Sequence, residues 1–128
     1  MDELSYLEAK ELTIEGYEEL IEEDGFKPEH AVSATFEDSV YMMKKSNKIY
    51  VSVITTLSII SLEQNFIPDY LLEKIDSLEV TEELNDDEKA IYKEEKAKLE
   101  SMLKTLDYRV EKNENYVERA RMLLKFIK

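Results

Sequence analysis

The sequence predicts a single, compact all-α bundle of about five to six helices over residues 1–128. Only two glycines and two prolines occur in the chain, which leaves little material for the many turns of an all-β fold. Hydrophobic residues make up 43% of the sequence, enough for one buried core, and they recur with helical spacing. No repeat or linker divides the chain, so we expect one domain.

Apolar stripes and end signals predict the first two helices. One helix is expected over residues 3–23, continuous or interrupted near Thr13, with its inward side chains at Leu7, Ile14, Tyr17 and Ile21. Asp24-Gly25 ends this helix, because glycine enters a left-handed cap at low cost. Pro28 suits the first turn of a second helix that runs to about residue 45. Its inward side chains are expected at Ala31, Val32, Thr35, Phe36, Val40 and Tyr41.

Residues 48–64 fit two patterns. A strand is favoured by the alternation of Ile49, Val51, Val53, Leu57 and Ile59. Helical spacing also describes the segment, through Ile49, Val53, Leu57 and Ile60. A strand of this length would be unusually long and would have no sheet to join, so we predict a buried central helix.

Three further helices are expected in the C-terminal half. Pro68 opens a short one that extends to Leu78. Asn85 and Glu88 form a capping box that starts a long helix. The stripe of that helix is Ile91, Tyr92, Leu99, Met102, Leu103, Leu106 and Val110. Asn113-Glu114-Asn115 interrupts it, and a last helix follows with inward side chains at Tyr116, Val117, Ala120, Leu123, Leu124 and Ile127.

Charge is distributed unevenly along the chain, whose net charge is −13. Residues 1–26 contain ten acidic residues and one lysine, and residues 73–88 contain eight acidic residues and one lysine. Residues 89–128 instead contain eleven basic and seven acidic residues. This balance disfavours direct binding to nucleic acid or to an anionic membrane, and it favours a protein partner with a basic surface.

No catalytic or cofactor-binding motif is recognisable. Cysteine is absent, which excludes disulfides and zinc-thiolate sites. No nucleophile accompanies His30, the single histidine, so we expect it to be an ordinary surface or boundary residue. Asn85-Asp86-Asp87-Glu88 lacks the glycine and closing glutamate of a calcium loop, and no glycine-rich phosphate loop occurs. We therefore expect a protein that is not an enzyme and has no metal and no cofactor.

The start of the chain and its apolar content predict a soluble, cytoplasmic protein. Met1-Asp2-Glu3-Leu4 is acidic where a secretory signal requires a basic region and then an apolar run. The most apolar stretch, Ile49 to Leu62, is too short to cross a membrane and contains several Ser and Thr residues. The sequence leaves monomer and dimer open.

The first helix concentrates acidic side chains in a pattern that weakens it. Like charges stand four residues apart at Glu11/Glu15, Glu15/Glu19, Glu18/Glu22 and Glu19/Glu23. Acidic residues also occupy its C-terminus, where the helix dipole favours cations. Because local rules broken without local gain often mark function, we predict a partner-binding face at Glu11, Glu15, Glu18, Glu19, Glu22, Glu23 and Asp24. A solvated face that only aids solubility explains the pattern about equally well.

The spacing of these carboxylates approaches that of a polyanion. From Glu15 to Asp24 the helix axis advances about 13–14 Å, which gives one charge per ~2–3 Å, against one per ~1.7 Å in duplex DNA. A second candidate surface lies in the acidic block 79–88, at Glu83, Asp86 and Asp87. Candidate aromatic anchors are Tyr6, Phe26 and Tyr70, although aromatic residues of small helical proteins more often belong to the core.

About half of the chain resembles a known family. The matching features are Tyr17-Glu18-Glu19-Leu20, Gly25-Phe26 before a helix with Ala31 and Ala34, Lys48-Ile49-Tyr50-Val51, and Ser61-Leu62-Glu63-Gln64-Asn65-Phe66-Ile67. In these features residues 17–78 resemble immunity protein type three of bacterial polymorphic toxin systems. The resemblance implies a cytoplasmic antidote that binds the toxic C-terminal domain of a secreted or contact-delivered toxin and covers its active site or substrate groove. Nuclease toxins often have basic grooves, which the acidic helix would suit.

Three kinds of function follow from these observations. The first is an immunity protein that neutralises a cognate toxin domain by occlusion. The second is an acidic nucleic-acid mimic that inhibits a DNA-binding protein. The third is a helical adaptor whose basic segment 89–128 associates with the acidic blocks. We rank the immunity protein first, and an enzyme last.

Overall fold

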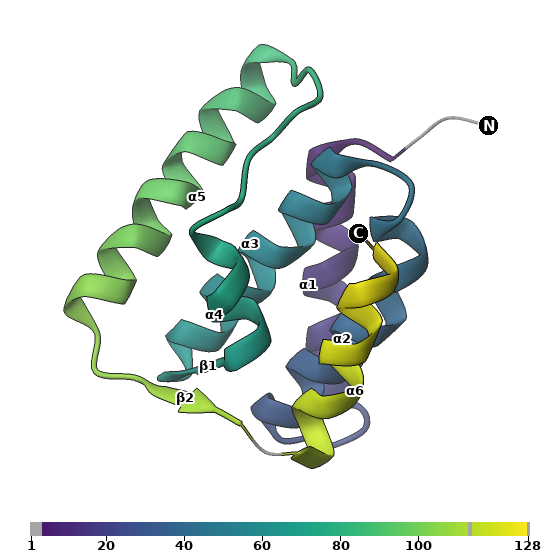
Figure 1. Cartoon of the computed structure of the whole chain (residues 1–128), viewed down its shortest axis with the longest axis vertical. Helices are drawn as coiled ribbons and strands as arrows, with labels where there is room; N and C mark the ends of the chain where they lie inside the picture. The colour runs from purple at the N-terminus through teal and green to yellow at the C-terminus, as the bar shows by residue number, and fades with distance from the viewer. Residues whose placement is uncertain (1–3, 113, 128) are drawn as a thin grey trace.

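The computed structural model describes residues 4–112 and 114–127 and confirms the all-α bundle (Figure 1). In chain order the elements are α1 (Tyr6–Glu22), α2 (Pro28–Met43), α3 (Asn47–Glu63), β1 (Phe66–Pro68), α4 (Asp69–Ile75), α5 (Asp86–Thr105), β2 (Arg109–Glu111) and α6 (Glu114–Ile127). Within the described residues there are thus six helices and two short strands. Asn113, the side chain of Tyr116 and residues 1–3 lie outside the described residues. The expected interruption at Glu114-Asn115 was wrong, because both residues already belong to α6.

Helix α3 forms the centre of the bundle and packs against α1, α2, α4 and α5 (Figure 1). Thirteen of its seventeen residues are buried, so it has no solvent face of its own. Its N-terminus is capped by the Ser46 hydroxyl, which accepts from the amide of Ile49 (3.3 Å). The hydroxyl of Ser52 donates to the carbonyl of Tyr6 in α1 (2.8 Å). The predicted buried central helix is therefore confirmed.

Helix α1 ends where the sequence predicts. Gly25 has a φ of 69°, and the amide of Phe26 donates to the carbonyl of Leu20 (3.0 Å), which closes a Schellman-type cap. The helix is continuous through Thr13, whose hydroxyl donates to the carbonyl of Ala9 (2.8 Å).

The inward face of α1 differs from the predicted one. Its buried residues are Tyr6, Ala9 and Thr13, whereas the predicted stripe of Leu7, Ile14, Tyr17 and Ile21 is only half-buried. The small side chains of Ala9 and Thr13 allow α1 to approach its neighbouring helices closely on this side. At Gly16, an added Cβ would already lie 3.8 Å from the Thr35 side chain of α2.

In α2, four of the predicted inward residues are buried, Val40 is half-buried, and Tyr41 is exposed. The expectation for Tyr41 was wrong because Ser39 and Met43 take the inward positions at this end of the helix. The Tyr41 ring instead lies at the surface, with the Nζ atom of Lys45 4.9 Å from its centroid.

The capping box that starts α5 is confirmed. The amide of Glu88 donates to Asn85 Oδ1 (2.8 Å), and the amide of Asn85 donates to Glu88 Oε1 (3.3 Å). Helix α4 is shorter than predicted, since Pro68 is its N-cap and it ends at Ile75.

The expected extension of α5 to Val110 was wrong. The helix ends at Thr105, and residues 109–111 form β2, which pairs in parallel with β1. Asn65 turns the chain before β1 with a φ of 64°, and its carbonyl accepts from the amide of Arg109 (3.1 Å). Because this backbone pairing joins segments distant in sequence, helical periodicity could not reveal it.

Helix α6 packs mainly on α2 and also contacts α4 (Figure 1). Its buried residues include the predicted Val117, Ala120 and Leu124, and Leu123 and Ile127 are half-buried. Two ion pairs flank this packing: Arg119 with Glu37 of α2 (2.5 Å) and Arg121 with Asp69 of α4.

We predict that Leu57→Ala destabilises the protein by about 2–5 kcal/mol, because it leaves a cavity in the fully buried centre of α3. The matched control Leu12→Ala makes the same change at a side chain that is 47% exposed on α1 and should cost less than about 0.5 kcal/mol. Urea denaturation followed by circular dichroism measures both. Equal losses would contradict the central position of α3.

Candidate functional site

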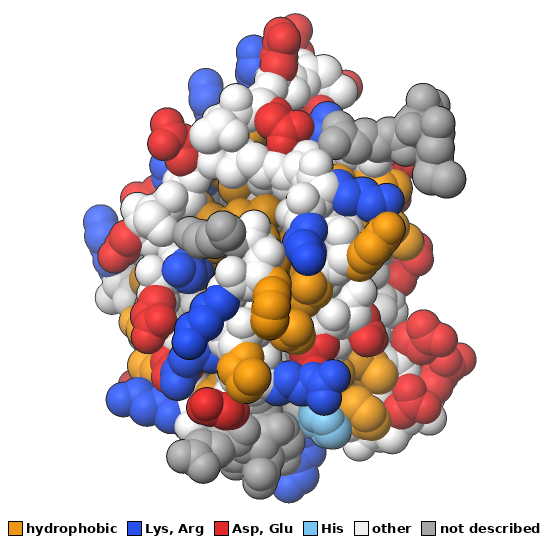
Figure 2. All heavy atoms as spheres, turned by 45° about the vertical axis from the view of Figure 1, so that its right-hand side comes forward, with side chains coloured by type: hydrophobic (Ala, Val, Ile, Leu, Met, Phe, Trp, Pro, Cys, Tyr) orange, Lys and Arg blue, Asp and Glu red, His pale blue; other side chains and the backbone are white. Residues whose placement is uncertain are grey.

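The predicted partner-binding residues of the first helix form one exposed surface, called here the acidic face: Glu11, Glu15, Glu18, Glu19, Glu22, Glu23 and Asp24. The first five belong to α1, and the last two lie in its C-terminal turn. Because the opposite side of α1 packs on α2 and α3, these carboxylates point to solvent. Figure 2 shows Asp and Glu side chains gathered at the lower right edge of the molecule.

Five side chains of the acidic face surround a shallow depression of about 290 Å³: Glu15, Glu18, Glu19, Glu22 and Glu23. The pKa of Glu23 is raised above its ordinary value, chiefly because its carboxyl group hydrogen-bonds to that of Glu19 and lies in the field of that negative charge. The depression therefore concentrates carboxyl groups that repel one another when ionised, which is an arrangement suited to a positively charged partner.

No described lysine or arginine forms an ion pair with the acidic face. All three arginines are engaged by other acidic residues: Arg109 by Glu29 (2.8 Å) and Glu111 (3.0 Å), Arg119 by Glu37, and Arg121 by Asp69. The basic C-terminal segment thus neutralises carboxylates elsewhere in the fold. The charge of the acidic face is left for solvent or for a partner.

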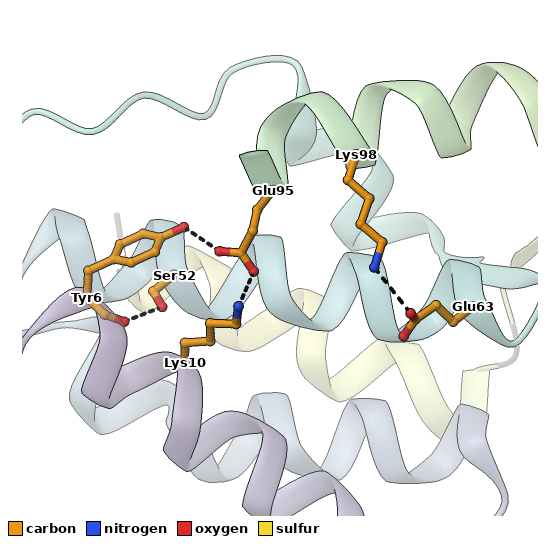
Figure 3. Close-up of polar contacts among 6 residues, drawn as sticks. All are labelled: Tyr6, Lys10, Ser52, Glu63, Glu95 and Lys98. Atoms are coloured by element: carbon orange, nitrogen blue, oxygen red, sulfur yellow. Dashed lines mark hydrogen bonds and ion pairs between the residues drawn. The ribbon is translucent and has the colours of Figure 1, made fainter. Parts of the chain in front are cut away.

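The single lysine of α1 is directed toward α5 (Figure 3). Lys10 Nζ lies 2.7 Å from Glu95 Oε2 of α5, and the hydroxyl of Tyr6 donates to Glu95 Oε1 (3.4 Å). Burial, together with the charge of Glu95, raises the pKa of Tyr6, so this hydroxyl stays protonated as a donor. A second pair joins Lys98 of α5 to Glu63 of α3 (3.4 Å). These cations attach α5 to the bundle and do not reach the acidic face.

The second acidic block divides into structural and exposed residues. Glu82 accepts from the amide of Lys48 at the start of α3 (3.1 Å), and Glu88 is buried in the capping box, where it also accepts from the amide of Leu7 (3.4 Å). The predicted site residues Glu83, Asp86 and Asp87 are exposed. Asp86 and Asp87 occupy the first turn of α5, where the helix dipole stabilises negative charge, so their presence has a local explanation.

The structure does not bring the two acidic sets together. Glu88 contacts Leu7 in the first turn of α1, whereas the depression lies toward the other end of that helix. At ~1.5 Å per residue, Leu7 and Glu19 are about 18 Å apart along the axis. The two sets are therefore separate surfaces.

Two of the three expected anchors belong to the core, since Tyr6 and Tyr70 are fully buried. Phe26 is half-buried just beyond the acidic face, where its ring stacks on that of the exposed His30 (4.2 Å between centroids, 8° between planes). Leu12 was missed by the sequence reasoning, although its spacing three residues before Glu15 places it on the acidic side of the helix. The Leu12 side chain is 47% exposed, so it offers an apolar group to a partner on the side of the helix that carries the carboxylates.

The described residues contain no group of three or more His, Cys, Asp or Glu side chains placed to hold a metal ion. None of the helices in the described part of the chain combines the length and the apolar character that a bilayer crossing needs. The chemistry of the acidic face itself is limited to accepting hydrogen bonds and attracting positive charge.

We predict that Glu23→Gln raises the melting temperature at pH 7 by about 1 °C, because it removes one of two adjacent carboxylates. The pKa of Glu23 is raised in the folded state, so its ionisation destabilises the fold above that raised pKa and has no effect below the ordinary value of 4.5. The gain should therefore vanish as the pH falls below about 4.5. The control Glu100→Gln, on α5 between Lys96 and Lys104, should give no increase. Thermal scans by circular dichroism across this pH range test the prediction, and a gain that persists at low pH would contradict it.

Comparisons with protein-family models, with curated proteins and with solved structures yield no match to this chain. The function proposed below therefore rests on the residues and contacts described above and on the resemblance of residues 17–78.

Proposed function

We propose that this chain is an immunity protein that binds and neutralises a cognate bacterial toxin domain, with the acidic face as the principal contact. The observation that carries this proposal is that seven exposed carboxylates on one helix and its C-terminal turn have no described lysine or arginine as an ion-pair partner. A positively charged partner would remove their mutual repulsion, so the charge would contribute to binding. The resemblance of residues 17–78 to the immunity family supports the class of partner.

Binding would proceed by charge attraction followed by local burial. Electrostatic steering speeds encounter with a basic surface, whereas most of the affinity of such interfaces comes from a few apolar or aromatic anchors. Leu12 and Phe26 are the candidates on this side of the molecule. Because α1 packs against α2 and α3, its backbone is already in place before docking, and only the exposed side chains have to be ordered. The bound chain would cover the active site or substrate groove of the toxin.

A nucleic-acid mimic is the alternative favoured by the density of the carboxylates. In that case the acidic face would occupy the DNA groove of a host protein. Two observations together would favour the mimic. The chain would compete with duplex DNA for a purified host DNA-binding protein, and no toxin gene would lie next to the gene that encodes the chain. The helical adaptor remains a third proposal, in which the acidic face would bind the basic segment 89–128 of another copy.

A growth assay tests the immunity function directly. We expect that production of the C-terminal domain encoded by the gene immediately upstream arrests a bacterial host, and that co-production of this chain restores growth. Continued arrest despite stable accumulation of both proteins would contradict the proposal. An unrelated acidic helical protein of similar net charge is the control, and it should give no protection.

Charge reversal tests the acidic face. The variant E15K/E18K/E19K/E22K should weaken binding to the toxin domain by about 10–100-fold at low salt, because steering and attraction are lost together. The matched variant E79K/E83K/D86K/D87K changes the net charge of the chain equally and should bind nearly as the unaltered protein does. Isothermal titration calorimetry at two salt concentrations measures affinity, and circular dichroism verifies folding. A loss confined to the second variant would assign binding to the other acidic surface.

A further inference from the structure

The outward face of α6 is apolar at its centre. Ala120 and Leu124 are buried against the bundle, and at about 100° per residue Met122 points nearly opposite to both. Met122 is 54% exposed, and Phe126, one turn later, is 66% exposed. Figure 2 shows hydrophobic side chains in the open with Lys and Arg side chains around them. Exposed apolar side chains that adjoin one another are candidates for an interaction surface.

Charged and aromatic residues flank Met122 on two edges of the helix. Glu118 and Lys125 lie along one edge of the outward face, and Arg119 and Phe126 lie along the other. The Arg119 edge is turned toward α2, since Arg119 pairs with Glu37 (2.5 Å). These five exposed residues are called here the α6 patch: Glu118, Arg119, Met122, Lys125 and Phe126.

We propose that the α6 patch is the interface of a homodimer in which two α6 helices pack antiparallel about a two-fold axis at Met122. When the two-fold axis is perpendicular to both helices, the Glu118–Lys125 edge of one copy lies beside the same edge of the second copy, and the two edges run in opposite directions. Glu118 lies about 6 Å before Met122 along the helix, and Lys125 lies about 4.5 Å after it. Glu118 of one copy therefore stands beside Lys125 of the other, and this ion pair occurs twice.

The other edge is complementary in the same way. Arg119 precedes Met122 by about 4.5 Å and Phe126 follows it by about 6 Å, so each guanidinium meets the aromatic ring of the second copy. The two Met122 side chains meet at the axis, where a flexible thioether fills an apolar contact well. Tyr41, 77% exposed, lies one helical turn after Glu37, the partner of Arg119, and adds aromatic surface on this side of α2. The α6 patch is therefore complementary to a second copy of itself.

The antiparallel arrangement is preferred over a parallel one because antiparallel helices place opposite dipole ends together. Helix α6 is 14 residues long, so the contact is small and we expect a weak, concentration-dependent dimer. The acidic face belongs to another helix, so this dimer does not depend on the proposed immunity function.

Sedimentation equilibrium of the 128-residue chain, from roughly 10 µM to 1 mM, tests the dimer. We expect a monomer–dimer equilibrium, and we expect Phe126→Gln to weaken it at least about tenfold. The matched control Leu12→Gln removes an exposed apolar side chain from α1 and should leave the equilibrium unchanged. A monomer throughout this range, or a dimer insensitive to Phe126→Gln, would overturn the proposal.

Charge exchange tests the orientation. Glu118→Lys alone and Lys125→Glu alone should each weaken the dimer, because each sets like charges together at two places. The double variant E118K/K125E should restore it, since the pairs are re-formed with their signs exchanged. In a parallel dimer the reversed side chain at position 118 would meet Arg119, and restoration would fail. Circular dichroism of each variant confirms folding, and a failure to restore in a folded protein overturns the antiparallel interface.

Discussion

The burial of α3 on all its sides is the constraint on which the arrangement of the other helices depends. An apolar helix without a solvent face must be covered, and α1, α2, α4 and α5 provide that cover. Small hydroxyl residues allow this close packing, and two of them donate to backbone carbonyls, Ser52 to that of Tyr6 and Ser61 to that of Leu57. Helix α1 contacts α2 and α3 on one side, so its other side is available to solvent or to a partner.

The distribution of cations determines the electrostatic character of those outer faces. Lysines and arginines of the C-terminal half pair with carboxylates of the N-terminal half, such as Lys98 with Glu63 and Arg119 with Glu37. Exposed pairs of this kind contribute little to stability. Their larger consequence is that they engage basic side chains that would otherwise be available to neutralise the acidic residues of α1. No described lysine or arginine pairs with the acidic face, and the raised pKa of Glu23, which hydrogen-bonds to Glu19 and lies in the field of its charge, is a local sign of the crowded carboxyl groups.

Two surfaces of contrasting chemistry result from this arrangement. The acidic face offers many like charges with Leu12 among them, which suits a basic partner. The α6 patch has both signs of charge around Met122 and Phe126, which suits a copy of itself. Because they lie on different helices, one chain can use both surfaces at once. A dimer formed through α6 would then present the acidic face twice to a multivalent partner.

The sequence by itself determined the features that depend on neighbouring residues. These include the end of α1 at Gly25, the start of α5 at its Asn85 capping box, and the outward position of the clustered acidic residues. The tertiary structure alone decided which side of α1 turns inward, that Tyr41 is exposed, and that α5 gives way to a strand. It also decided that the two acidic sets lie apart and that an apolar residue, Met122, faces outward from α6. All of these depend on contacts between residues distant in the chain, which helical periodicity does not record.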